Sequence, residues 1–521
     1  MGTHIKSRTA NSLQNTKVSL FFYLLILVTT FFSRKVFINS LGTEILGLNT
    51  TITNLLGLLN LSELGIGTAV SFALFKPLLD GNRKNISEIV SVQGWLYRNI
   101  ALLIIIVGAI LMFFFPWIFQ KTDLPLWYAY STYLVFLTSS LLGYFINYRQ
   151  IILSADQKQY KITYITKGLT FLKLTIQIIL LYFSIGGYKG WLLVELVFAF
   201  ATAFLLEYSV RKTYPWLKTS CYVGKRVYKE YGEILTKIKQ LFFHKVAGYV
   251  LNQTSPIIIY AYTTLTLVAI YGNYMLIVAG VISLLVAIFS GIIPTLGNLI
   301  AEGKRKSILK IFGEYFACRM LIAGIATYCL WIGGNGFMVL WMGSEYLLEK
   351  LPFVLIVGIT FAGMTRVSDD FLAAYGLFRD IWAPISEAAL NLGLSILLGH
   401  FFSLSGILSG VLISLILVVH IWKPYFLCKN GLLIPVSKYY LKYILYCSIT
   451  LLSGFATYWL LGAANRDEAF SFTQWAIFLF KHMVLFSLIS YSITFLLDKG
   501  MKDFSQRVLY IIKEKLIKKN E

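Results

Sequence analysis

Long apolar segments recur along the whole chain and are separated by short polar ones. A helix of about 20 apolar residues is long enough to cross the hydrocarbon core of a bilayer. Several segments here exceed about 25 residues, so those helices are expected to tilt or to project beyond the hydrocarbon. The pattern therefore predicts an all-α polytopic membrane protein with about 14 transmembrane helices. The predicted spans lie approximately at residues 17–38, 45–75, 88–119, 126–153, 160–184, 188–210, 238–261, 267–300, 308–342, 347–377, 381–400, 405–427, 438–462 and 473–497.

The composition agrees with this class of protein. Of the 521 residues, 57% are hydrophobic and only 13% are charged, whereas a soluble domain usually has about 25% charged residues. No long polar stretch occurs, so we do not expect an appended soluble catalytic domain. The 5 cysteines show no paired or Cys-x-x-Cys spacing, which argues against a disulfide framework and against a zinc site.

The formal net charge of +22 resembles that of a nucleic-acid-binding protein until the positions of the charges are considered. The N-terminus and alternate loops contain 33 Lys and Arg residues, whereas the intervening loops contain 4. Basic residues concentrate in the loops of a membrane protein that stay in the cytoplasm. The asymmetry therefore predicts that both termini are cytoplasmic. It also explains the basic composition without a nucleic-acid partner.

A short internal similarity indicates that the chain contains two related halves. The longest cytoplasmic loop, 211–239, divides 6 predicted spans from 8, and the pattern acid-Gly-x-Arg-Lys-x-Ile occurs at both 80–86 and 302–308. If each copy has an even number of spans, both copies enter the membrane from the same side and are parallel repeats. We therefore expect two pseudo-symmetric lobes of six helices, followed by two further helices. The expected domains are an N-lobe at 1–213, a cytoplasmic linker at 214–235, a C-lobe at 236–428, two C-terminal spans within 429–497, and a basic amphipathic cytoplasmic tail at 498–521.

Nine basic residues remain in or near the predicted spans after the loop charges are set aside. Each such residue costs about 2.5–3.5 kcal/mol at the centre of a bilayer unless it meets water, a carboxylate or an anion. Most of those near span ends are explained by snorkelling or anchoring. Lys173 is different, because it lies about 13 residues into the fifth span, roughly 20 Å along the helix. The nine residues are Arg34, Lys35, Arg98, Lys167, Lys173, Lys245, Arg319, Arg366 and Lys481.

Lys173 belongs to a polar stripe at helical spacing, formed with Thr166, Thr170 and Gln177. Such a stripe on a membrane helix is expected to face an aqueous lumen or a protein partner. Hydrogen bonding between helices explains any single stripe. Four stripes together with unpaired buried cations favour a water-filled central cavity of cationic character. The other stripes are Asn49, Thr53, Asn60, Glu63, Gly67 and Ser71 in the second span, Glu387, Asn391 and Ser395 in the eleventh, and Tyr23, Thr30 and Arg34 in the first.

Two further arginines have two interpretations each. Asp369 and Asp370 follow Arg366 by three and four residues, a spacing that allows an internal ion pair on one helix face. A carboxylate left free in the cavity would instead be a site for a proton or a coupling ion. Arg319 has only Glu314 and Tyr315 nearby on its helix face, so contact with an anion and buried pairing are both open.

The motifs of common enzymes are absent from the sequence. No G-x-x-x-x-G-K-[ST] loop, HExxH, GxSxG or Cys/His metal-binding spacing occurs. The predicted outer loops are short, so they offer little room for a catalytic domain. We therefore expect neither enzymatic activity nor a metal or other cofactor.

A series of short motifs in the first hundred residues resembles a known family. The first span ends in Phe-Phe-Ser-Arg-Lys at 31–35, and Leu-Gly at 41–42, Leu-Gly-Leu at 46–48 and Leu-Ser-Glu-Leu-Gly-Ile-Gly at 61–67 follow. This series is similar to the polysaccharide transporter branch of the MOP exporter superfamily, the Wzx-type O-antigen and capsule-repeat flippases of bacteria. Beyond residue 100 the similarity is architectural. The residues that match the family pattern are Arg34, Gly42, Gly47, Glu63 and Gly65.

The resemblance implies a MOP/MATE-like fold in the bacterial cytoplasmic (inner) membrane. It also implies a flippase that moves an undecaprenyl-pyrophosphate-linked oligosaccharide by alternating access, coupled to H⁺ or Na⁺. Its partners would then be the lipid-linked oligosaccharide, membrane lipids, and the glycan polymerase and glycosyltransferases of the same pathway. The alternatives are a MATE-like cation or drug antiporter and a polytopic glycan polymerase or ligase. A cavity for cationic drugs is expected to be acidic and aromatic, so the basic spans count against the antiporter.

The predicted site has two groups of residues. Basic and amide side chains are expected to contact the anionic head group and the sugars, and carboxylates are expected to provide polar or ion-coupling groups. The predicted substrate-binding residues are Arg34, Lys173, Arg319, Arg366, Asn252 and Gln177. The predicted ion-coupling residues are Glu63, Asp369, Asp370 and Glu387.

Overall fold

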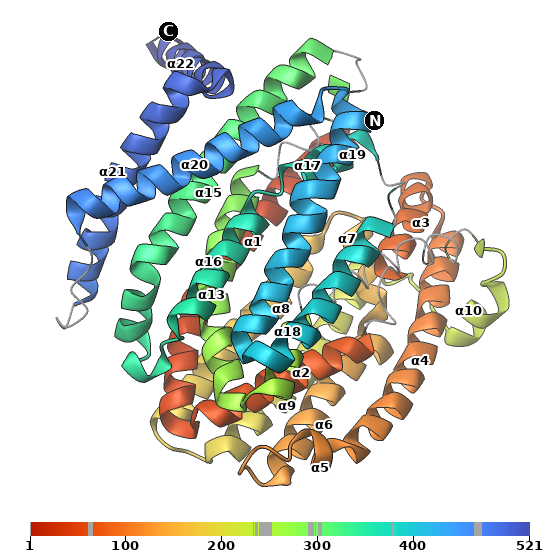
Figure 1. Ribbon diagram of the computed structural model, residues 1–521. Helices are drawn as coiled ribbons and strands as arrows, with labels where there is room; N and C mark the ends of the chain where they lie inside the picture. The colour runs from red at the N-terminus through yellow and green to blue at the C-terminus, as the bar shows by residue number, and fades with distance from the viewer. Residues whose placement is uncertain are drawn as a thin grey trace. The chain divides into compact units, whose positions relative to one another are not determined.

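The computed structural model shows a protein built from helices (Figure 1). It describes residues 2–60, 66–232, 234, 238, 253–289, 296, 299–300, 305–377, 380, 382–462 and 471–520. No strand occurs among these residues. The all-α fold class predicted from the apolar segments is therefore confirmed.

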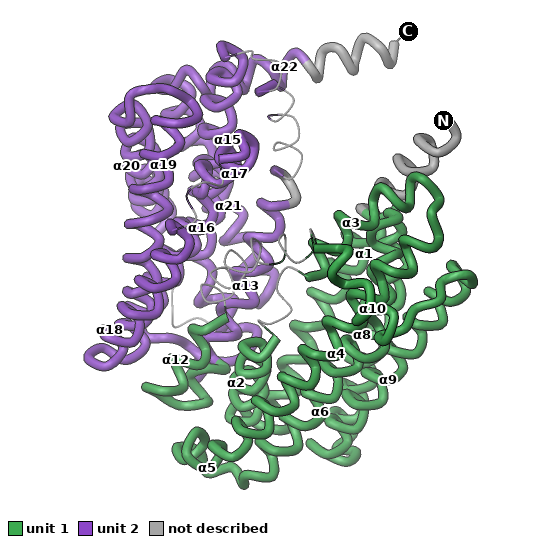
Figure 2. Tube along the Cα trace, turned by 90° about the vertical axis from the view of Figure 1, so that its right-hand side faces the viewer, with its two compact units in different colours: residues 1–269 green, residues 270–521 purple. Residues whose placement is uncertain are grey.

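The chain forms two compact units, Met1–Ala269 and Ile270–Glu521 (Figure 2). The boundary lies inside helix α13 (Leu265–Phe289). The first unit contains α1 (Gly2–Leu41), α2 (Thr43–Leu59), α3 (Ile66–Asp80), α4 (Arg83–Phe113), α5 (Phe115–Ile118), α6 (Leu126–Phe145), η2 (Asn147–Gln150), α7 (Ile151–Ala155), α8 (Gln159–Tyr182), α9 (Gly187–Thr213), α10 (Cys221–Val227) and α12 (Ser255–Tyr262).

The second unit contains the rest of α13 and the helices that follow it. Helix α15 has 37 residues and contributes much of the buried core. Its elements are α15 (Arg305–Trp341), η3 (Ser344–Tyr346), α16 (Lys350–Met364), α17 (Val367–Tyr375), α18 (Trp382–Ser414), η4 (Leu415–Trp422), α19 (Lys423–Leu427), η5 (Cys428–Leu432), α20 (Val436–Leu461), α21 (Phe472–Leu497) and α22 (Lys499–Asn520).

Ten of the described helices are long and apolar enough to cross a membrane, and an eleventh span is formed if α6 and the bent segment after it are counted as one. The bend of 59° separates Leu126–Phe145 from Asn147–Ala155, which together match the fourth predicted span. The second predicted span corresponds to α2 and α3, whereas most of the seventh lies outside the described residues. The protein is a multi-pass membrane protein, and the count of about 14 spans stays a prediction.

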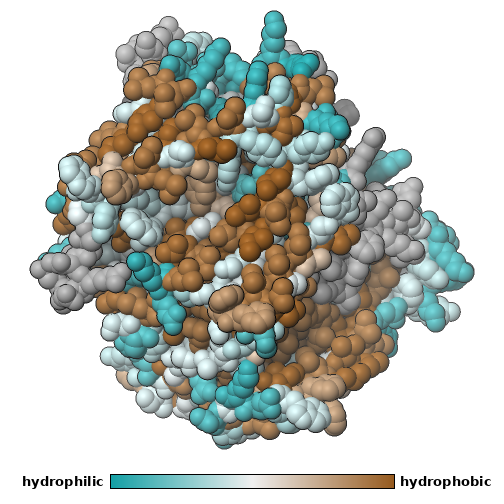
Figure 3. Space-filling view, in the orientation of Figure 1, coloured by the Kyte–Doolittle hydropathy of each residue, from teal (hydrophilic) through white to brown (hydrophobic). Residues whose placement is uncertain are grey.

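Apolar side chains remain exposed along the surfaces of these helices, as expected where lipid takes the place of water. Trp459 on α20 is 76% exposed and Leu496 on α21 is 69% exposed. Apolar side chains also predominate on the face of the molecule seen in Figure 3. Exposed apolar surface of this extent marks an interaction surface in a soluble protein, and here it is explained by the bilayer.

The continuous segment from Trp382 to Leu432 contains two predicted spans and reverses direction between them. Phe402 and Ser403 leave the helical conformation, with Ser403 at φ 48°. The two limbs then run back along each other. Asn391 Nδ2 donates to Ser414 Oγ at 3.4 Å, and Ser395 Oγ donates to the carbonyl of Ile407 at 3.1 Å. These antiparallel contacts show a helical hairpin, which explains how 51 residues contain the eleventh and twelfth predicted spans.

Glycine allows the limbs of this hairpin to approach closely. A Cβ atom at Gly406 would lie 1.9 Å from the carbonyl oxygen of Leu398. Because the obstacle is backbone, it cannot rotate out of the way. A methyl group at this position would therefore force the two limbs apart.

We expect Gly406→Ala to lower the free energy of unfolding by about 1–3 kcal/mol or more, the range for overpacking. Thermal unfolding of the purified protein in detergent, followed by intrinsic fluorescence, measures this change. Gly393→Ala is the matched control, since a Cβ atom there would have no neighbour within 4 Å. This control is expected to be neutral, or to stabilise by up to about 1 kcal/mol through helix propensity. Equal effects of the two substitutions would contradict the close packing of the hairpin.

Part of the predicted linker folds back onto the first unit. Helix α10 packs along α4, where a Cβ atom at Gly224 would lie 2.0 Å from the carbonyl oxygen of Ser91. The rings of Trp95 and Tyr228 stack with 4.6 Å between their centroids, and Tyr231 donates a hydrogen bond of 2.8 Å to Glu88. The described part of this segment is therefore an ordered surface element.

Candidate substrate cavity and buried charge clusters

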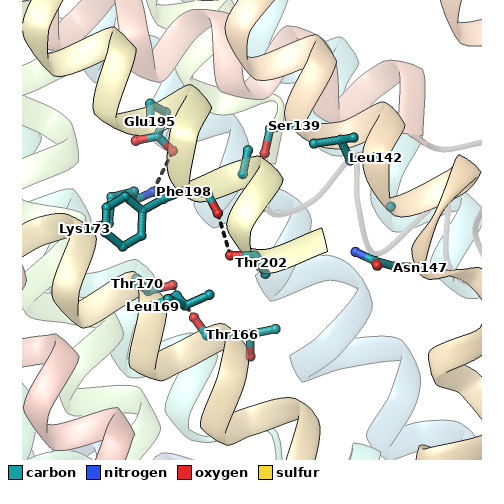
Figure 4. A pocket seen from close by; sticks show the side chains of 12 residues that line it. Ser139, Leu142, Asn147, Thr166, Leu169, Thr170, Lys173, Glu195, Phe198 and Thr202 are labelled. Atoms are coloured by element: carbon teal, nitrogen blue, oxygen red, sulfur yellow. Dashed lines mark hydrogen bonds and ion pairs between the residues drawn. The ribbon is translucent and has the colours of Figure 1, made fainter. Parts of the chain in front are cut away.

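A polar cavity of about 230 Å³ lies inside the first unit, between α6, α8 and α9 (Figure 4). Helix α8 contributes three members of the predicted polar stripe, Thr166, Thr170 and Lys173. The opposite side of α8 carries Leu172 and Ile179, which are 50% and 48% exposed. The helix is thus polar towards the protein and apolar towards lipid. Three members of the stripe line a cavity and two of the four bond to a neighbouring helix, so each of the two interpretations describes part of the stripe.

The fourth member of the stripe, Gln177, lies one turn beyond Lys173 and is 1% exposed. Its amide nitrogen donates to Glu195 Oε2 at 3.0 Å and to the carbonyl of Trp191 at 3.3 Å. Lys173 Nζ donates to the other oxygen, Glu195 Oε1, at 2.6 Å. Glu195 therefore joins two members of the stripe from the neighbouring helix α9. Figure 4 shows its contact with Lys173.

The expectation that the cation of this stripe is unpaired is wrong for Lys173. Its partner, Glu195, was not among the predicted site residues. The sequence did contain a signal for this residue, because Glu195 is an isolated acidic residue in an apolar stretch of the sixth predicted span. An ionisable residue inside a span is a functional candidate by default. In the structure the cavity wall carries one ammonium group and one carboxylate, so its formal charge is balanced.

The hydroxyl groups of the cavity come from all three helices, and its amide group comes from η2. Besides the two threonines of α8, the wall includes Ser139, Asn147 and Thr202. Asn147 sits at the bend after α6, where the chain turns inward and buries its side chain. These groups offer hydrogen bonds in several directions around the ion pair.

Arg34 lies near the end of the apolar part of α1 and is half-buried. Its guanidinium donates a hydrogen bond of 3.4 Å to the carbonyl of Ala269. The structure thus places Arg34 against the last residue of the first unit, and Arg34 is not among the residues that line the cavity.

A cluster of four charged side chains lies in the second unit, formed by Arg366, Asp369, Glu387 and Lys423. Asp369 Oδ2 accepts a hydrogen bond from Arg366 Nε at 2.6 Å, and Asp369 Oδ1 lies 2.9 Å from Lys423 Nζ. Glu387 lies 3.7 Å from Arg366 Nη1 and 3.3 Å from Lys423 Nζ. Each carboxylate therefore contacts both cations, and the charges of the cluster cancel. The ion pair between Arg366 and Asp369 is the structural interpretation that their spacing allowed.

Lys423 lies in the predicted span 405–427, yet it is one of the 33 basic residues assigned to cytoplasmic loops; the structure corrects this assignment, because it places Lys423 in helix α19 beside two carboxylates. Its side chain is only 12% exposed, because α19 continues the second limb of the hairpin and points Lys423 towards α17 and α18. Glu387 is buried to 1% exposure, and its Oε1 accepts no hydrogen bond within the described part of the chain. The charge on Glu387 is therefore stabilised mainly by the two neighbouring cations.

Arg319 forms a second ion pair in this unit, with Asp370. The same guanidinium contacts the hydroxyl of Tyr315, and its Nε donates to the carbonyl of Met364 at 2.7 Å. Tyr315 in turn donates to Asp370. Of the two interpretations of Arg319, the structure shows buried pairing. It also separates the two aspartates, since Asp369 faces Arg366 and Asp370 faces Arg319.

Several members of the polar stripes of the second and eleventh spans contact neighbouring helices. Asn49 accepts a hydrogen bond of 2.6 Å from Tyr188, and Asn60 accepts from Ser140 and Tyr144 at 3.0 Å each. In the eleventh span, Asn391 and Ser395 hold the hairpin together. Hydrogen bonding between helices therefore explains these positions, as the simpler interpretation proposed.

Two predicted site residues, Asn252 and Glu63, lie outside the described residues. Within the described residues, no group of three or more His, Cys, Asp or Glu side chains is placed to hold a metal ion. The chemistry that the structure brings together is therefore ion pairing and hydrogen bonding.

No protein-family model matches the sequence, and no curated protein matches it. Known structures do match the fold. The structure of the lipid II flippase MurJ in an inward closed conformation is similar with a TM-score of 0.66 and 13% identity, covering 92% of this chain and 99% of that chain. An inward-facing multidrug resistance MATE family transporter of the MOP superfamily is similar with a TM-score of 0.58 and 14% identity, covering 81% and 99%.

A mutant of the Vibrio cholerae MATE transporter VcmN gives a TM-score of 0.51 and 12% identity, covering 82% of this chain and 99% of that chain. At such identities the similarity establishes the fold. The extent of the match agrees with the all-α, multi-pass architecture expected from the apolar pattern. The chain therefore has the MOP-type, MATE-like transporter fold.

Proposed function

We propose that the protein is a flippase that moves an undecaprenyl-pyrophosphate-linked oligosaccharide from the inner to the outer leaflet of the bacterial cytoplasmic membrane. The observation that carries this proposal is the polar cavity between α6, α8 and α9, which presents the ammonium group of Lys173 among hydroxyl and amide groups. A pyrophosphate needs a cation, and sugars need hydrogen-bonding side chains. The similarity to a structure named as a lipid II flippase supports the same class of substrate.

The ion pair with Glu195 gives the cavity a way to release its substrate. A phosphate oxygen that enters the cavity competes with Glu195 Oε1 for Lys173 Nζ. Because the two side chains remain 21% and 15% exposed, the ammonium group is reachable without unfolding the helices. When the substrate leaves, Glu195 takes its place and keeps the cation from being stranded in a low-dielectric site. Gln177 holds the carboxylate close by in either state.

The carboxylates of the second unit are the candidates for ion coupling. Asp369, Asp370 and Glu387 each sit beside a buried cation, so adding a proton or Na⁺ would change the local charge balance. Such a change can favour one of two packings of the surrounding helices. Glu63, which lies outside the described residues, is kept as an ion-coupling candidate on the sequence pattern alone. Transport by alternating access, driven by the H⁺ or Na⁺ gradient, follows from this assignment.

The test uses the full-length protein in proteoliposomes that contain an undecaprenyl-pyrophosphate-linked oligosaccharide. A membrane-impermeant lectin reports sugar that reaches the outer leaflet. We expect the protein to raise the rate of lectin labelling above that of protein-free vesicles, and an imposed proton or sodium gradient to raise it further. Equal rates with and without protein would contradict the proposal.

In cells, we expect Arg34→Ala and Lys173→Ala each to reduce surface glycan and to cause lipid-linked repeat units to accumulate on the cytoplasmic side. The measurement is extraction of the lipid-linked pool together with immunoblotting of surface glycan. Thr175→Val on α8, outside the cavity wall, is the control and should export normally. Normal glycan export by both variants would remove these two residues from the proposed site.

A MATE-like cation antiporter is the second candidate, and the balanced charge of the cavity favours it. A cationic substrate could replace Lys173 beside Glu195, just as a phosphate could replace Glu195 beside Lys173. Efflux of a fluorescent organic cation from the same proteoliposomes separates the two functions. Cation efflux without sugar translocation would replace the flippase proposal with the antiporter.

The proposed orientation places both termini in the cytoplasm, since the sequence has 33 basic residues in the N-terminus and one set of loops, or 32 without Lys423, and 4 in the other set. We expect a green fluorescent protein fused after Glu521 to fluoresce and alkaline phosphatase at the same position to be inactive. A fusion of each reporter within 463–470, in a predicted outer loop, is the control and should give the reverse result. Active phosphatase at the C-terminus would contradict the orientation.

A further inference from the structure

A second polar pocket lies in the second unit, where the ends of three spans meet helix α22. It has a volume of about 440 Å³. Lys306 and Lys310 come from the first two turns of α15, Lys442 comes from the start of α20, and Lys499 begins α22. Two aspartates, Asp498 and Asp503, complete the charged lining. Four lysines and two aspartates leave the wall with a formal excess of two positive charges.

The two aspartates do not neutralise the charges of the four lysines equally. Asp498 Oδ2 is already bound by Lys442 Nζ at 3.0 Å and accepts a hydrogen bond from Tyr446 at 2.8 Å. The other three lysines are exposed and stand around the opening with Asp503 as the one remaining acid of the wall. Lys306 and Lys310 are four residues apart and so share a face of α15. The pocket therefore presents three exposed ammonium groups to an incoming anion.

The pocket is built into the packing of the fold, because α22 is fixed against α15 by a close glycine contact. A Cβ atom at Gly500 would lie 2.3 Å from the carbonyl oxygen of Gly313. Met501, the next residue, is fully buried, and Phe504 packs against the same core. The first turns of α22 therefore hold Lys499 and Asp503 in place beside α15. The positive end of the α22 dipole adds to the field of the lysines.

Exposed apolar side chains directly precede two residues of the pocket wall in the sequence. Leu441 and Leu497 directly precede Lys442 and Asp498, and they are 68% and 62% exposed. In a membrane-spanning helix these side chains face acyl chains. The basic pocket thus sits at the depth where spans end and headgroup phosphates begin. The charge asymmetry of the loops assigns these span ends to the cytoplasmic leaflet.

We propose that this pocket binds the phosphate of an anionic lipid of the cytoplasmic leaflet. The lysines and the start of α22 bind the phosphate, while the exposed leucines contact the acyl chains. A bound lipid links α15, α20 and α22 through one headgroup. Inorganic phosphate has the same anionic group as the lipid headgroup, but it has no acyl chains to contact the exposed leucines. The test therefore compares inorganic phosphate with the lipid directly.

The experiment uses the detergent-purified full-length protein and phosphatidylglycerol with a fluorescent acyl chain. Displacement by unlabelled lipids gives relative affinities. We expect phosphatidylglycerol to displace the probe at least about tenfold better than phosphatidylcholine, and binding to weaken as salt is raised, because the contact is with exposed charges. Inorganic phosphate at the same concentration should not displace the probe. Equal affinity for the two lipids would overturn the proposal, and efficient displacement by inorganic phosphate would assign the pocket to a free anion instead.

Variants tie the binding to this pocket. Lys310→Gln combined with Lys499→Gln is expected to weaken phosphatidylglycerol binding by about 30-fold, since each lysine near an anionic headgroup contributes about a fivefold factor. Lys310→Arg with Lys499→Arg keeps both charges and should bind within about threefold of the natural protein. Lys429→Gln with Lys438→Gln removes two exposed lysines outside the pocket and is the control. An equal loss in the control, or no loss in the first variant, would overturn the assignment.

Discussion

Replacing Lys173 with methionine is expected to stop transport and also to destabilise the first unit. The substitution leaves Glu195 facing the cavity without its cation, held only by the Gln177 amide. An ionised carboxylate without a partner is costly in a medium of low dielectric constant. Because the pair is partly exposed to the cavity, we expect a loss of about 2–3 kcal/mol in the free energy of unfolding, below the range for a fully buried pair.

A double substitution separates the structural role of this pair from its role in transport. Lys173→Met with Glu195→Gln removes both charges and keeps the volumes of the side chains. Replacing a buried ion pair by neutral groups of similar size is often neutral or stabilising. We therefore expect the double variant to unfold at about the same temperature as the natural protein. The cavity would then lack the cation that a phosphate needs, so sugar translocation in proteoliposomes should remain absent.

Two outcomes decide between the roles. A double variant that is stable but inactive assigns Lys173 to substrate binding. A double variant that is stable and transports normally would show that the ion pair only holds α8 and α9 together. Lys173→Arg, which keeps the charge, is the conservative control and is expected to retain part of the activity.

Replacing Glu387 with glutamine is expected to give the largest loss of stability. The carboxylate is 1% exposed and lies within 3.7 Å of both Arg366 and Lys423. Without its charge, two partly buried cations share Asp369 alone. Breaking a buried ion network by removing one partner costs about 3–5 kcal/mol. Thermal unfolding in detergent and elution as a single species on size-exclusion chromatography measure the effect.

A compensating variant tests whether charge balance is the cause. Lys423→Met combined with Glu387→Gln leaves the pair of Arg366 and Asp369, whose side chains are joined at 2.6 Å. We expect this double variant to recover most of the lost stability, with a coupling energy of about 1–3 kcal/mol in a double-mutant cycle. Glu345→Gln changes an exposed acid of the same unit and is the control. Additive effects of the two substitutions would contradict a shared charge cluster.

The apolar pattern was sufficient to predict the fold class because transfer into lipid depends on local composition. Each stretch of about 20 apolar residues becomes a helix wherever it lies in the chain. The predicted segments 160–184 and 188–210, for example, correspond closely to α8 and α9. Helical spacing also predicted that Thr166, Thr170 and Lys173 share one face. Chain length and hydropathy were the only information that these predictions needed.

The partners of the buried charges could not be predicted in the same way. Lys173 pairs with a residue 22 positions away, and Lys423 pairs with Asp369 only because the hairpin of α18 and η4 brings α19 beside α17. The local spacing did predict the pair of Arg366 and Asp369, since both lie on one turn. It could not predict that Asp370, one residue further on, turns to Arg319 on another helix.

The amino-acid sequence by itself determined a chain of membrane-spanning helices, the sign of the charge in each set of loops, and the polar face of α8. The tertiary structure decided which cations are neutralised, which stripes bond helices together, and which one lines a cavity. The physical reason is that membrane insertion depends on the free energy of each segment alone. Ion pairing instead depends on the rotation and contact of helices that are distant in the sequence.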